Sequence, residues 1–472
     1  MKNGIETVEL RNENPIVSFR LLFRVGSIHD GAKPGITALT AALMARGGTA
    51  SLTAAELNQK LFPMAAEIDV QVDKELTVFT GRVHRDHLAT YLPMFMDVLL
   101  APRFDPKEFE RMRADAVADI EKRLRTSDDE NLGKAALEWM MHLDNWGAFV
   151  GGTVRGLKAM TLDDAKKHAR TFFTRDHLTA GFAGGATDTI IDDVTKRLAT
   201  LPVCDARVKG TVGKPQPRVL IIENGASSTA VSIGHPIALA RNFADFIPLR
   251  VGMSAFGEHR QSGGRLFERL REKRGLNYGD YAYAEAFVQE PDTTHPLVNI
   301  ARSRQDFSIW IRPVAHEHAM FALRAALYEL DKLLREGLTD DEVKRAGGFL
   351  DGFSRQWEAA DLRRLGYALD DVFYGTKGYL GELRAQIPSL TAEKVNAAIR
   401  RHVRFGDLQI AIVTKDGKKL RDAILLGAPT PITYPTPKSK DVVAEDPKIA
   451  AFPLRFKPEE VVVVPVSQLF EN

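Results

Sequence analysis

The chain has 472 residues, about three times the ~150 residues typical of one domain, so two or more folding units are expected. Lys and Arg number 64 against 62 Asp and Glu, and this balance provides no electrostatic footprint for binding nucleic acid or an anionic membrane. The single cysteine, Cys204, excludes an intrachain disulfide and a cysteine-based zinc site. No apolar run approaches the ~18 residues that a membrane span needs.

The first half of the chain alternates strand-like and helix-like segments. Apolar residues alternate with polar ones from Ile68 to Val72, before a turn at Asp73, which is typical of a hairpin. Asp105 followed by Pro106 provides an N-cap and a first helical position. The elements predicted in chain order are a strand at 16–25, a hairpin at 67–83, a helix at 105–123, a helix at 161–173 and a strand at 178–184.

The second half repeats this order. Segment 99–112 aligns with 333–346, and segment 160–184 aligns with 390–414 at nearly the same offset. Each aligned pair contains an N-cap followed by a helix. Shared capping chemistry alone explains one such match, but two matches at nearly one offset favour a duplicated domain.

Prolines and glycines mark a boundary near 203–217, where Pro202, Pro215 and Pro217 flank a glycine-containing stretch. The chain beyond Ala428 is rich in proline and then charged, which predicts a tail that packs over the surface in extended form. A valine run at 461–464 argues against disorder throughout that tail. The predicted organisation is an N-terminal domain over 1–205, a linker over 206–217, a C-terminal domain over 218–428 and a tail over 429–472.

Several common catalytic motifs are missing from the sequence. The twelve histidines are scattered and form neither His-Glu-x-x-His nor His-x-x-Glu-His. There is no Gly-x-Ser-x-Gly nucleophile elbow, no P-loop and no dinucleotide fingerprint. The closest histidine pairs, His84 with His87 and His316 with His318, are expected to lie on the surface.

The most informative segment is 252–287. A glycine-rich loop leads into an amphipathic helix with Leu266, Phe267 and Leu270 on one face, and Gly275 is a suitable residue to end that helix. An alternating strand carrying three tyrosines is predicted next, at positions Tyr278, Tyr281 and Tyr283.

This segment resembles the second-domain signature of the pitrilysin/insulinase-type metallopeptidases, the inverzincins, which include the mitochondrial processing peptidase and bacterial relatives. The resemblance extends to the opening strand and first helix near 23–37, to the Pro-Arg-Phe stretch before Phe109 and to 233–236. It implies an α+β fold of two homologous tandem α/β domains, each a mainly antiparallel sheet with helices packed on it. The duplication inferred above is what that family shows.

The chain departs from the family at the metal site. An active member carries His-x-x-Glu-His on its first helix, with two zinc ligands at i and i+4 and a general base at i+3. Those positions are here Ala38, Ala41 and Ala42, or Leu39, Ala42 and Leu43 in the neighbouring register. The family's third ligand position falls near Asp119. One carboxylate cannot hold catalytic zinc, so no metal is expected in this chain.

The residues that the family places in the other half of a split active site are present in this chain. In this family a second-domain Arg and Tyr, seven residues apart, reach the substrate beside the zinc, and Arg271 and Tyr278 have that spacing. Both side chains are donors suited to binding substrate and to stabilising an oxyanion. Without the resemblance, Arg271 reads as a solvated helix residue and Tyr278 as an aromatic of a strand core.

Three functions fit these residues. The first is the non-zinc subunit of a heterodimeric peptidase, similar to the alpha subunit of the mitochondrial processing peptidase and inactive alone. The second is a structural or assembly subunit, resembling core proteins of the respiratory cytochrome complex. The third is a stand-alone peptide-binding protein or homodimer. Retention of both Arg271 and Tyr278 favours the first.

The first function implies partners and a cofactor. A homologous subunit with His-x-x-Glu-His would hold zinc, and unstructured peptides would bind by adding a strand to an exposed sheet edge. Nucleic acid and a membrane span are not expected. Because no apolar signal-peptide core follows Met1, the expected compartment is the cytoplasm, or the bacterial periplasm if a presequence has been removed.

Overall fold

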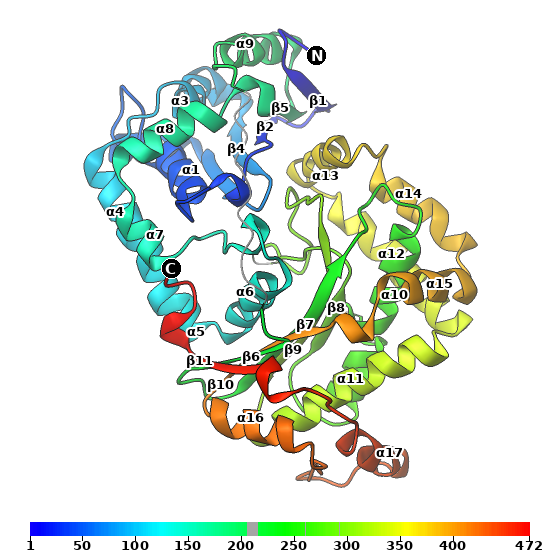
Figure 1. The fold of residues 1–472 in the computed structure, drawn as a ribbon. Helices are drawn as coiled ribbons and strands as arrows, with labels where there is room; N and C mark the ends of the chain where they lie inside the picture. The colour runs from blue at the N-terminus through cyan, green and yellow to red at the C-terminus, as the bar shows by residue number, and fades with distance from the viewer. Residues whose placement is uncertain (205–215, 260, 292) are drawn as a thin grey trace.

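The computed structural model of the protein describes residues 1–204, 216–259, 261–291 and 293–472. They form two halves, each with one sheet and its helices (Figure 1). The strands of the first half are β1 (Glu6–Arg11), β2 (Ile16–Phe23), β3 (Glu67–Val72), β4 (Thr77–His84) and β5 (Leu178–Gly184). Its helices are α1 (Ile36–Arg46), α2 (Ala54–Leu61), α3 (Leu88–Leu100), α4 (Pro106–Ala118), α5 (Arg125–Ser127), α6 (Asp129–Met141), α7 (Val154–Ala159), α8 (Leu162–Phe172) and α9 (Asp188–Leu198), and a π-helical segment, Asp119–Leu124, continues α4.

The second half contains the remaining elements. Its strands are β6 (Val219–Glu223), β7 (Thr229–Ile237), β8 (Asp280–Tyr283), β9 (Gln305–Val314), β10 (Gln409–Thr414) and β11 (Val461–Pro465). Its helices are α10 (Phe246–Gly257), a π-helical segment (Phe267–Glu272), α11 (Ala319–Glu336), α12 (Asp340–Trp357), α13 (Asp361–Tyr374), α14 (Tyr379–Gln386), α15 (Ala392–His402), α16 (Gly417–Leu426) and α17 (Lys440–Ala450). Among the described residues, no helix is long and apolar enough to cross a bilayer.

The two sheets have the same topology. The first runs β1-β5-β2-β4-β3, and the second repeats that order as β6-β10-β7-β9-β8, with β11 added beside β6. The pairs β1–β5 and β6–β10 are parallel. The three pairs that follow them in each order are antiparallel. The structure therefore confirms two homologous α/β units, each with a mainly antiparallel sheet.

One helix of each half packs on the sheet of the other half. α6 of the first half lies against β7 and β10, where Leu132 and Ala136 share a buried cluster with Ala411 and Val413. α13 of the second half lies against β1, β2 and β5, where Leu365 joins a buried cluster with residues of the first sheet. Figure 1 shows α6, in cyan, beside the second sheet and α13, in yellow, beside β1. Each half thus packs one of its helices on the sheet of the other half.

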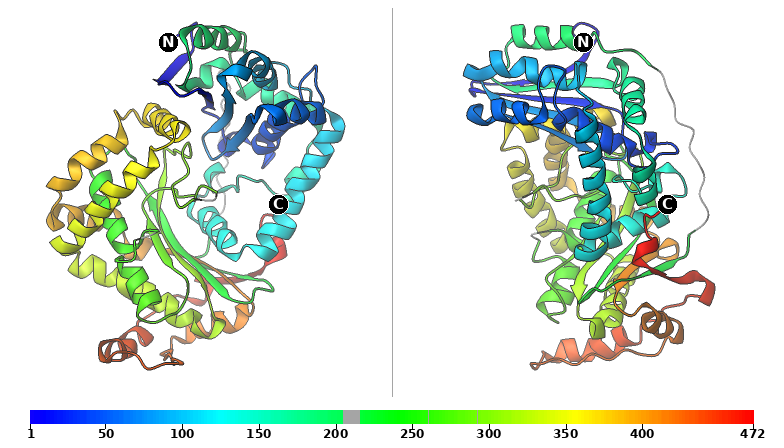
Figure 2. Two further views of the ribbon diagram at one scale, coloured as in Figure 1. Left: turned by 180° about the vertical axis from the view of Figure 1, so that it is seen from behind. Right: turned by 90° about the vertical axis from the view of Figure 1, so that its left-hand side faces the viewer.

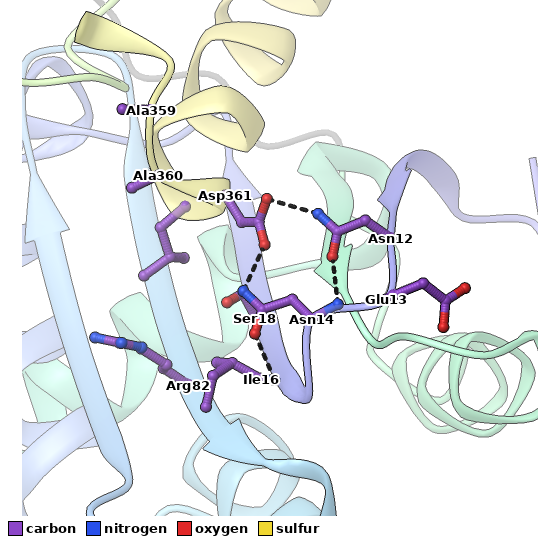
Figure 3. Close-up of a pocket in the computed structure, with 10 residues that line it drawn as sticks. Asn12, Glu13, Asn14, Ile16, Ser18, Arg82, Ala359, Ala360 and Asp361 are labelled. Atoms are coloured by element: carbon purple, nitrogen blue, oxygen red, sulfur yellow. Dashed lines mark hydrogen bonds between the residues drawn. The ribbon is translucent and has the colours of Figure 1, made fainter.

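Polar contacts fix the start of α13 on the first sheet. The side-chain amides of Asn12 and Asn14 donate to the two carboxylate oxygens of Asp361 at 2.8 and 3.0 Å (Figure 3). These residues line a cavity of about 530 Å³ between the halves. None of the predicted site residues lies in this cavity, so we assign it no part in the chemistry.

The hairpin between β3 and β4 is held by an ion-pair network from both halves. Arg302 contacts Asp73 through two bonds of 2.7 Å and also pairs with Glu138 on α6. Lys74, whose side chain is fully buried, pairs with Glu138 at 3.0 Å. Burial disfavours charge on Glu138, but the cations Arg302 and Lys74 outweigh it and lower the pKa of that carboxyl to about 2. The hairpin tip is therefore tied into the contact between the halves.

The observed elements match most of the predicted ones. The predicted hairpin, both predicted helices of the first half and the strand at 178–184 are present, and Gly275 has the left-handed φ of +68° expected of a residue after a helix. The predicted linker falls mostly on residues 205–215, outside the described residues.

Two predictions of local structure are wrong. Tyr278 does not belong to the strand, because β8 begins only at Asp280. The tail is not extended throughout, because α17 forms over Lys440–Ala450. Val442, Ile449 and Ala450 of that helix are buried, and α17 packs on α11. This tertiary packing outweighs the local sequence, which contains a helix-breaking proline.

The rest of the tail crosses from the second half to the first. β11 pairs in parallel with β6, and the chain end then reaches the helices of the first half, as both views in Figure 2 show. Arg125 donates to the carbonyl of Leu469 at 3.0 Å, and the rings of Phe149 and Phe470 stack at 5.0 Å. The C-terminus is therefore a third connection between the halves.

Candidate functional site

A small pocket on α1 contains the positions predicted for a lost metal site. Ala38 and Ala42, one helical turn apart, line it together with Asp119 from the π-helical segment after α4. The cavity measures about 140 Å³, and its other walls are mainly apolar or glycine. Ala41 is fully buried beside it. The fold thus brings two of the three alanines and the predicted third-ligand position to one place.

The residues of this pocket do not fit a catalytic zinc ion. The carboxylate of Asp119 already accepts from Arg123, with an Nη2 to Oδ2 distance of 2.9 Å. The alanine methyl groups offer no lone pair, and zinc in peptidases of this type requires imidazole and carboxylate ligands. Within the described ranges, no group of three or more His, Cys, Asp or Glu side chains is placed to hold a metal ion.

The start of α1 is fixed by a buried carboxyl group rather than by a metal. Asp30 accepts from the backbone N–H groups of Gly35 and Thr37 and from the Thr37 hydroxyl, at 2.6 to 3.0 Å. Burial raises the pKa of Asp30 to about 7. The same hydroxyl lies 2.9 Å from Nε2 of His168, whose pKa burial lowers to about 3. These contacts hold the helix that lines the pocket.

Arg271 and Tyr278 lie against each other in the second half. The guanidinium of Arg271 is 4.6 Å from the ring centroid of Tyr278, within the range of a cation–π contact. Tyr278 is 68% exposed, and Arg271 also stacks on Phe267 at 4.6 Å. The interpretation of Tyr278 as a strand-core aromatic is therefore wrong, and the pair presents a phenol and a guanidinium to solvent.

The turn that carries Tyr278 is fixed by its neighbours. The amide of Asn277 donates to Asp280 at 2.7 Å and to the carbonyl of Arg312 at 3.0 Å. Asp280 is fully buried, and burial raises its pKa to about 8. The carboxyl nearest in sequence to Tyr278 is therefore mostly protonated at neutral pH.

The tail helix α17 holds the segment that carries Arg271. The fully buried side chain of Arg274 pairs with Glu445 and Asp446 of α17, each at 2.9 Å. Arg269, two residues before Arg271, also pairs with Glu445, at 3.4 Å. Pairs on both sides of Arg271 thus fix the backbone of its turn.

Two elements of this site were missed by sequence reasoning. The guanidinium of Arg312 on β9 lies 5.4 Å from the Tyr278 ring, and α17 supports the segment from the far end of the chain. Both contacts join residues far apart in sequence, and neither position carries a local signal. His84, His316 and His318 are partly exposed and His87 is exposed.

Comparison with protein families supports the class that this fold and these sites define, a two-domain inverzincin-type chain. The family profile described as Insulinase (Peptidase family M16) matches residues 7–145, and the profile described as Peptidase M16 inactive domain matches residues 159–347. Together they cover more than half of the chain. The chain belongs to the insulinase family of peptidases, M16. Arg271 and Tyr278 fall within the second match, and α1 falls within the first.

Individual relatives agree with this assignment. An uncharacterized zinc protease of Streptomyces coelicolor is 25% identical over 380 residues, which are 75% of each chain. The solved peptidase M16 inactive domain of Pseudomonas fluorescens superposes with a TM-score of 0.76 at 22% identity, over 87% of this chain and 95% of that one. A chain of Complex III2 from Candida albicans has a TM-score of 0.67 at 13% identity, over 88% of this chain and 94% of that one. The two solved structures share the fold.

Proposed function

We propose that this chain is the non-zinc subunit of a heterodimeric zinc peptidase. It contributes Arg271 and Tyr278 to the binding of unstructured peptides and to stabilisation of the transition state. A homologous partner subunit with His-x-x-Glu-His would hold the zinc. This chain alone would not hydrolyse peptides.

The observation that carries the proposal is the exposed Tyr278 held by the Arg271 guanidinium at 4.6 Å. An aromatic residue used only for packing is normally buried. Here the phenol is exposed to solvent. The ion pair of the buried Arg274 with Glu445 of α17 supports the segment that carries Arg271, the residue in contact with Tyr278. Such support is what a donor site needs, because pre-organised donors cost no reorganisation during reaction.

The chemistry of the pair suits a peptide carbonyl. The phenol O–H and the guanidinium N–H groups donate to the carbonyl oxygen, and these bonds strengthen as negative charge develops on that oxygen. Tyr278 also precedes β8 by two residues, and β8 lies at one edge of the second sheet. An extended peptide that adds to this edge would pass beside Tyr278, which favours unstructured substrates.

The alanines of α1 support the assignment of the metal site to a second subunit. A chain that kept the donor pair for its own catalysis would need metal ligands at positions 38 and 42, where the pocket holds Ala38 and Ala42. The metal site must then come from another subunit. The curated relative from Streptomyces coelicolor carries the name zinc protease, in line with a zinc-dependent reaction for the assembled pair.

Purification of the tagged chain from its source cells, followed by mass spectrometry, tests this proposal. We expect a stoichiometric partner of similar size that carries His-x-x-Glu-His, and peptide cleavage by the pair but by neither subunit alone. Recovery of the chain by itself, or in a large assembly without such a subunit, would contradict the proposal and favour a binding or assembly role.

A further inference from the structure

Arg312, which lies on β9 outside the predicted pair, adds a second cation to the Tyr278 site. Its guanidinium is 5.4 Å from the Tyr278 ring centroid, and that of Arg271 is 4.6 Å from the same centroid. The side chains of Arg271 and Arg312 are 34% and 38% exposed. Two guanidinium groups and one phenol are therefore gathered at a place that a ligand can reach.

The positive charge at this site is not fully balanced. Glu130 on α6 is shared between Arg312, at 3.1 Å, and Lys134, at 2.7 Å. Among the described residues, the carboxylate within 4 Å of Arg271 is that of Glu272, which is 3.8 Å away and 57% exposed. Among the described residues, these ion pairs thus contain three cations and two carboxylates: Arg271, Arg312 and Lys134 against Glu130 and Glu272.

The nearby buried carboxyl group does not restore the balance. Asp280 lies in the strand that follows Tyr278, and its burial keeps it largely protonated at neutral pH, since its pKa is raised to about 8. The site therefore retains a net positive charge beside an exposed phenol donor.

We infer that Arg312, beside the Arg271–Tyr278 pair that donates to the peptide carbonyl, binds a carboxylate group of the substrate peptide, either an acidic side chain or the C-terminal carboxylate. The inference rests on the proposed function, because it names the peptide chemistry that the same site selects. Guanidinium groups present paired donors that match a carboxylate, and hydrogen bonds to a charged acceptor are roughly twice as strong as those to a neutral amide. Arg312 is then a specificity-determining residue.

Binding of labelled unstructured peptides to the full chain tests this inference. In one series every peptide has an amidated C-terminus and carries a single Glu, which replaces Gln at a different position in each peptide. The amidated all-Gln peptide is the reference. A second comparison uses the all-Gln peptide with a free C-terminal carboxylate. We expect about tenfold tighter binding of one acidic form than of the reference, as one charged hydrogen-bonded contact provides. The preferred peptide identifies the source of the carboxylate.

Substitutions assign the preference to this site. We expect the affinity ratio to fall close to unity in Arg312→Gln and to be partly retained in Arg312→Lys, which keeps the charge but loses the paired donors. The control Arg197→Gln removes an exposed arginine of α9, paired with Asp193 at 3.1 Å in the first half, and should keep the full ratio.

The outcomes separate this inference from the proposed function. Equal affinity for acidic and neutral peptides, or a preference that survives in Arg312→Gln, would overturn the inference while leaving peptide binding in place. Absence of binding to every peptide would instead overturn peptide binding by this chain, and the inference with it.

Discussion

Ala38 and Ala42 stand in a pocket where a metal-dependent member of this family needs imidazole groups. The remaining carboxylate, Asp119, is paired with Arg123. We therefore expect the purified chain to contain far less than one zinc ion per chain, by elemental analysis after dialysis against metal-free buffer. A stoichiometric zinc content that survives in Asp119→Asn would mean that the metal binds elsewhere, and one that is lost in this variant would show that the pocket itself binds zinc.

The buried His168 near α1 makes stability depend on pH. Burial lowers the pKa of His168 to about 3, so the folded chain keeps the ring neutral while the unfolded chain protonates it below about 6.5. The unfolded state then binds more protons, and stability falls as the pH falls from about 6.5 towards 3. His168→Gln should reduce this slope by up to about 1.4 kcal/mol per pH unit.

Urea unfolding of the wild type and of His168→Gln between pH 6 and pH 4.5 measures the difference in slope. Glutamine keeps a partner for the Thr37 hydroxyl but does not titrate. The raised pKa of Asp30 acts in the opposite direction in both proteins, so it cancels in the comparison. Parallel slopes would show that His168 is not held neutral by the fold.

The sequence predicted some of these residues and not others. Arg271 and Tyr278 were identified from their spacing and from the resemblance, and the alanines were identified because an expected motif was absent. The exposure of Tyr278 was not predicted, since three tyrosines near one another favoured a strand. The position of Arg312 follows from the pairing of β8 with β9, and no local pattern contains that information.

At the scale of elements, α17 is the support of the Arg271 segment. The Arg274 side chain is fully buried and pairs with Glu445 and Asp446. Removal of one partner from a buried ion pair leaves charge without compensation and typically costs about 3–5 kcal/mol. Arg274→Gln should therefore destabilise the chain by about 3 kcal/mol, and the assembled pair should lose turnover because Arg271 is no longer held.

An exposed ion pair provides the control. Arg335 pairs with Asp331 on α11 at 2.7 Å and is 58% exposed, so Arg335→Gln should cost at most about 0.5 kcal/mol. Denaturant unfolding gives both values. Equal small losses in the two variants would show that α17 does not stabilise the Arg271 segment.

Element prediction succeeded where local signals were strong. The helix after Asp105 has both an N-cap and a proline at its first position, and the structure confirms it. Helix α17 has an internal proline and is buried by contact with α11, so the sequence alone favoured an extended tail. Its function as a support depends on the same long-range contact.

In the whole molecule, each half contributes one helix to the packing of the other half. α6 covers part of the second sheet and α13 covers part of the first, and Arg302 joins the first-half hairpin to α6. Because each half lacks part of its core without the other, we expect the chain to unfold in one transition. Arg302→Gln should lower the free energy of unfolding by about 3–5 kcal/mol, since the buried carboxylate of Asp73 then loses the cation that pairs with it.

Arg304 lies two residues away and offers a matched control, because it is 51% exposed and pairs with Asp144 at 2.7 Å. Arg304→Gln should change stability by no more than about 1 kcal/mol. Two separate unfolding transitions, or equal effects of the two substitutions, would contradict the view that the halves fold as one unit.

The duplication was visible in the sequence because the aligned segments keep their caps and helices. The exchange of α6 and α13 was not visible. Their apolar residues fit any helix that packs on a sheet, and nothing in the sequence tells which sheet is covered. Among the site residues, Arg312 depends on this exchange, because it pairs with Glu130 of α6 at 3.1 Å.

The most direct test of the central claim is the turnover of the reconstituted pair with Tyr278→Phe in this subunit. We predict a loss of about 100- to 1000-fold in kcat, the effect of removing one oxyanion donor, while the two subunits still assemble. The control Tyr328→Phe, which removes a phenol O–H on α11, should leave kcat unchanged. Unchanged turnover of Tyr278→Phe in the intact pair would contradict the claim that this chain completes the active site.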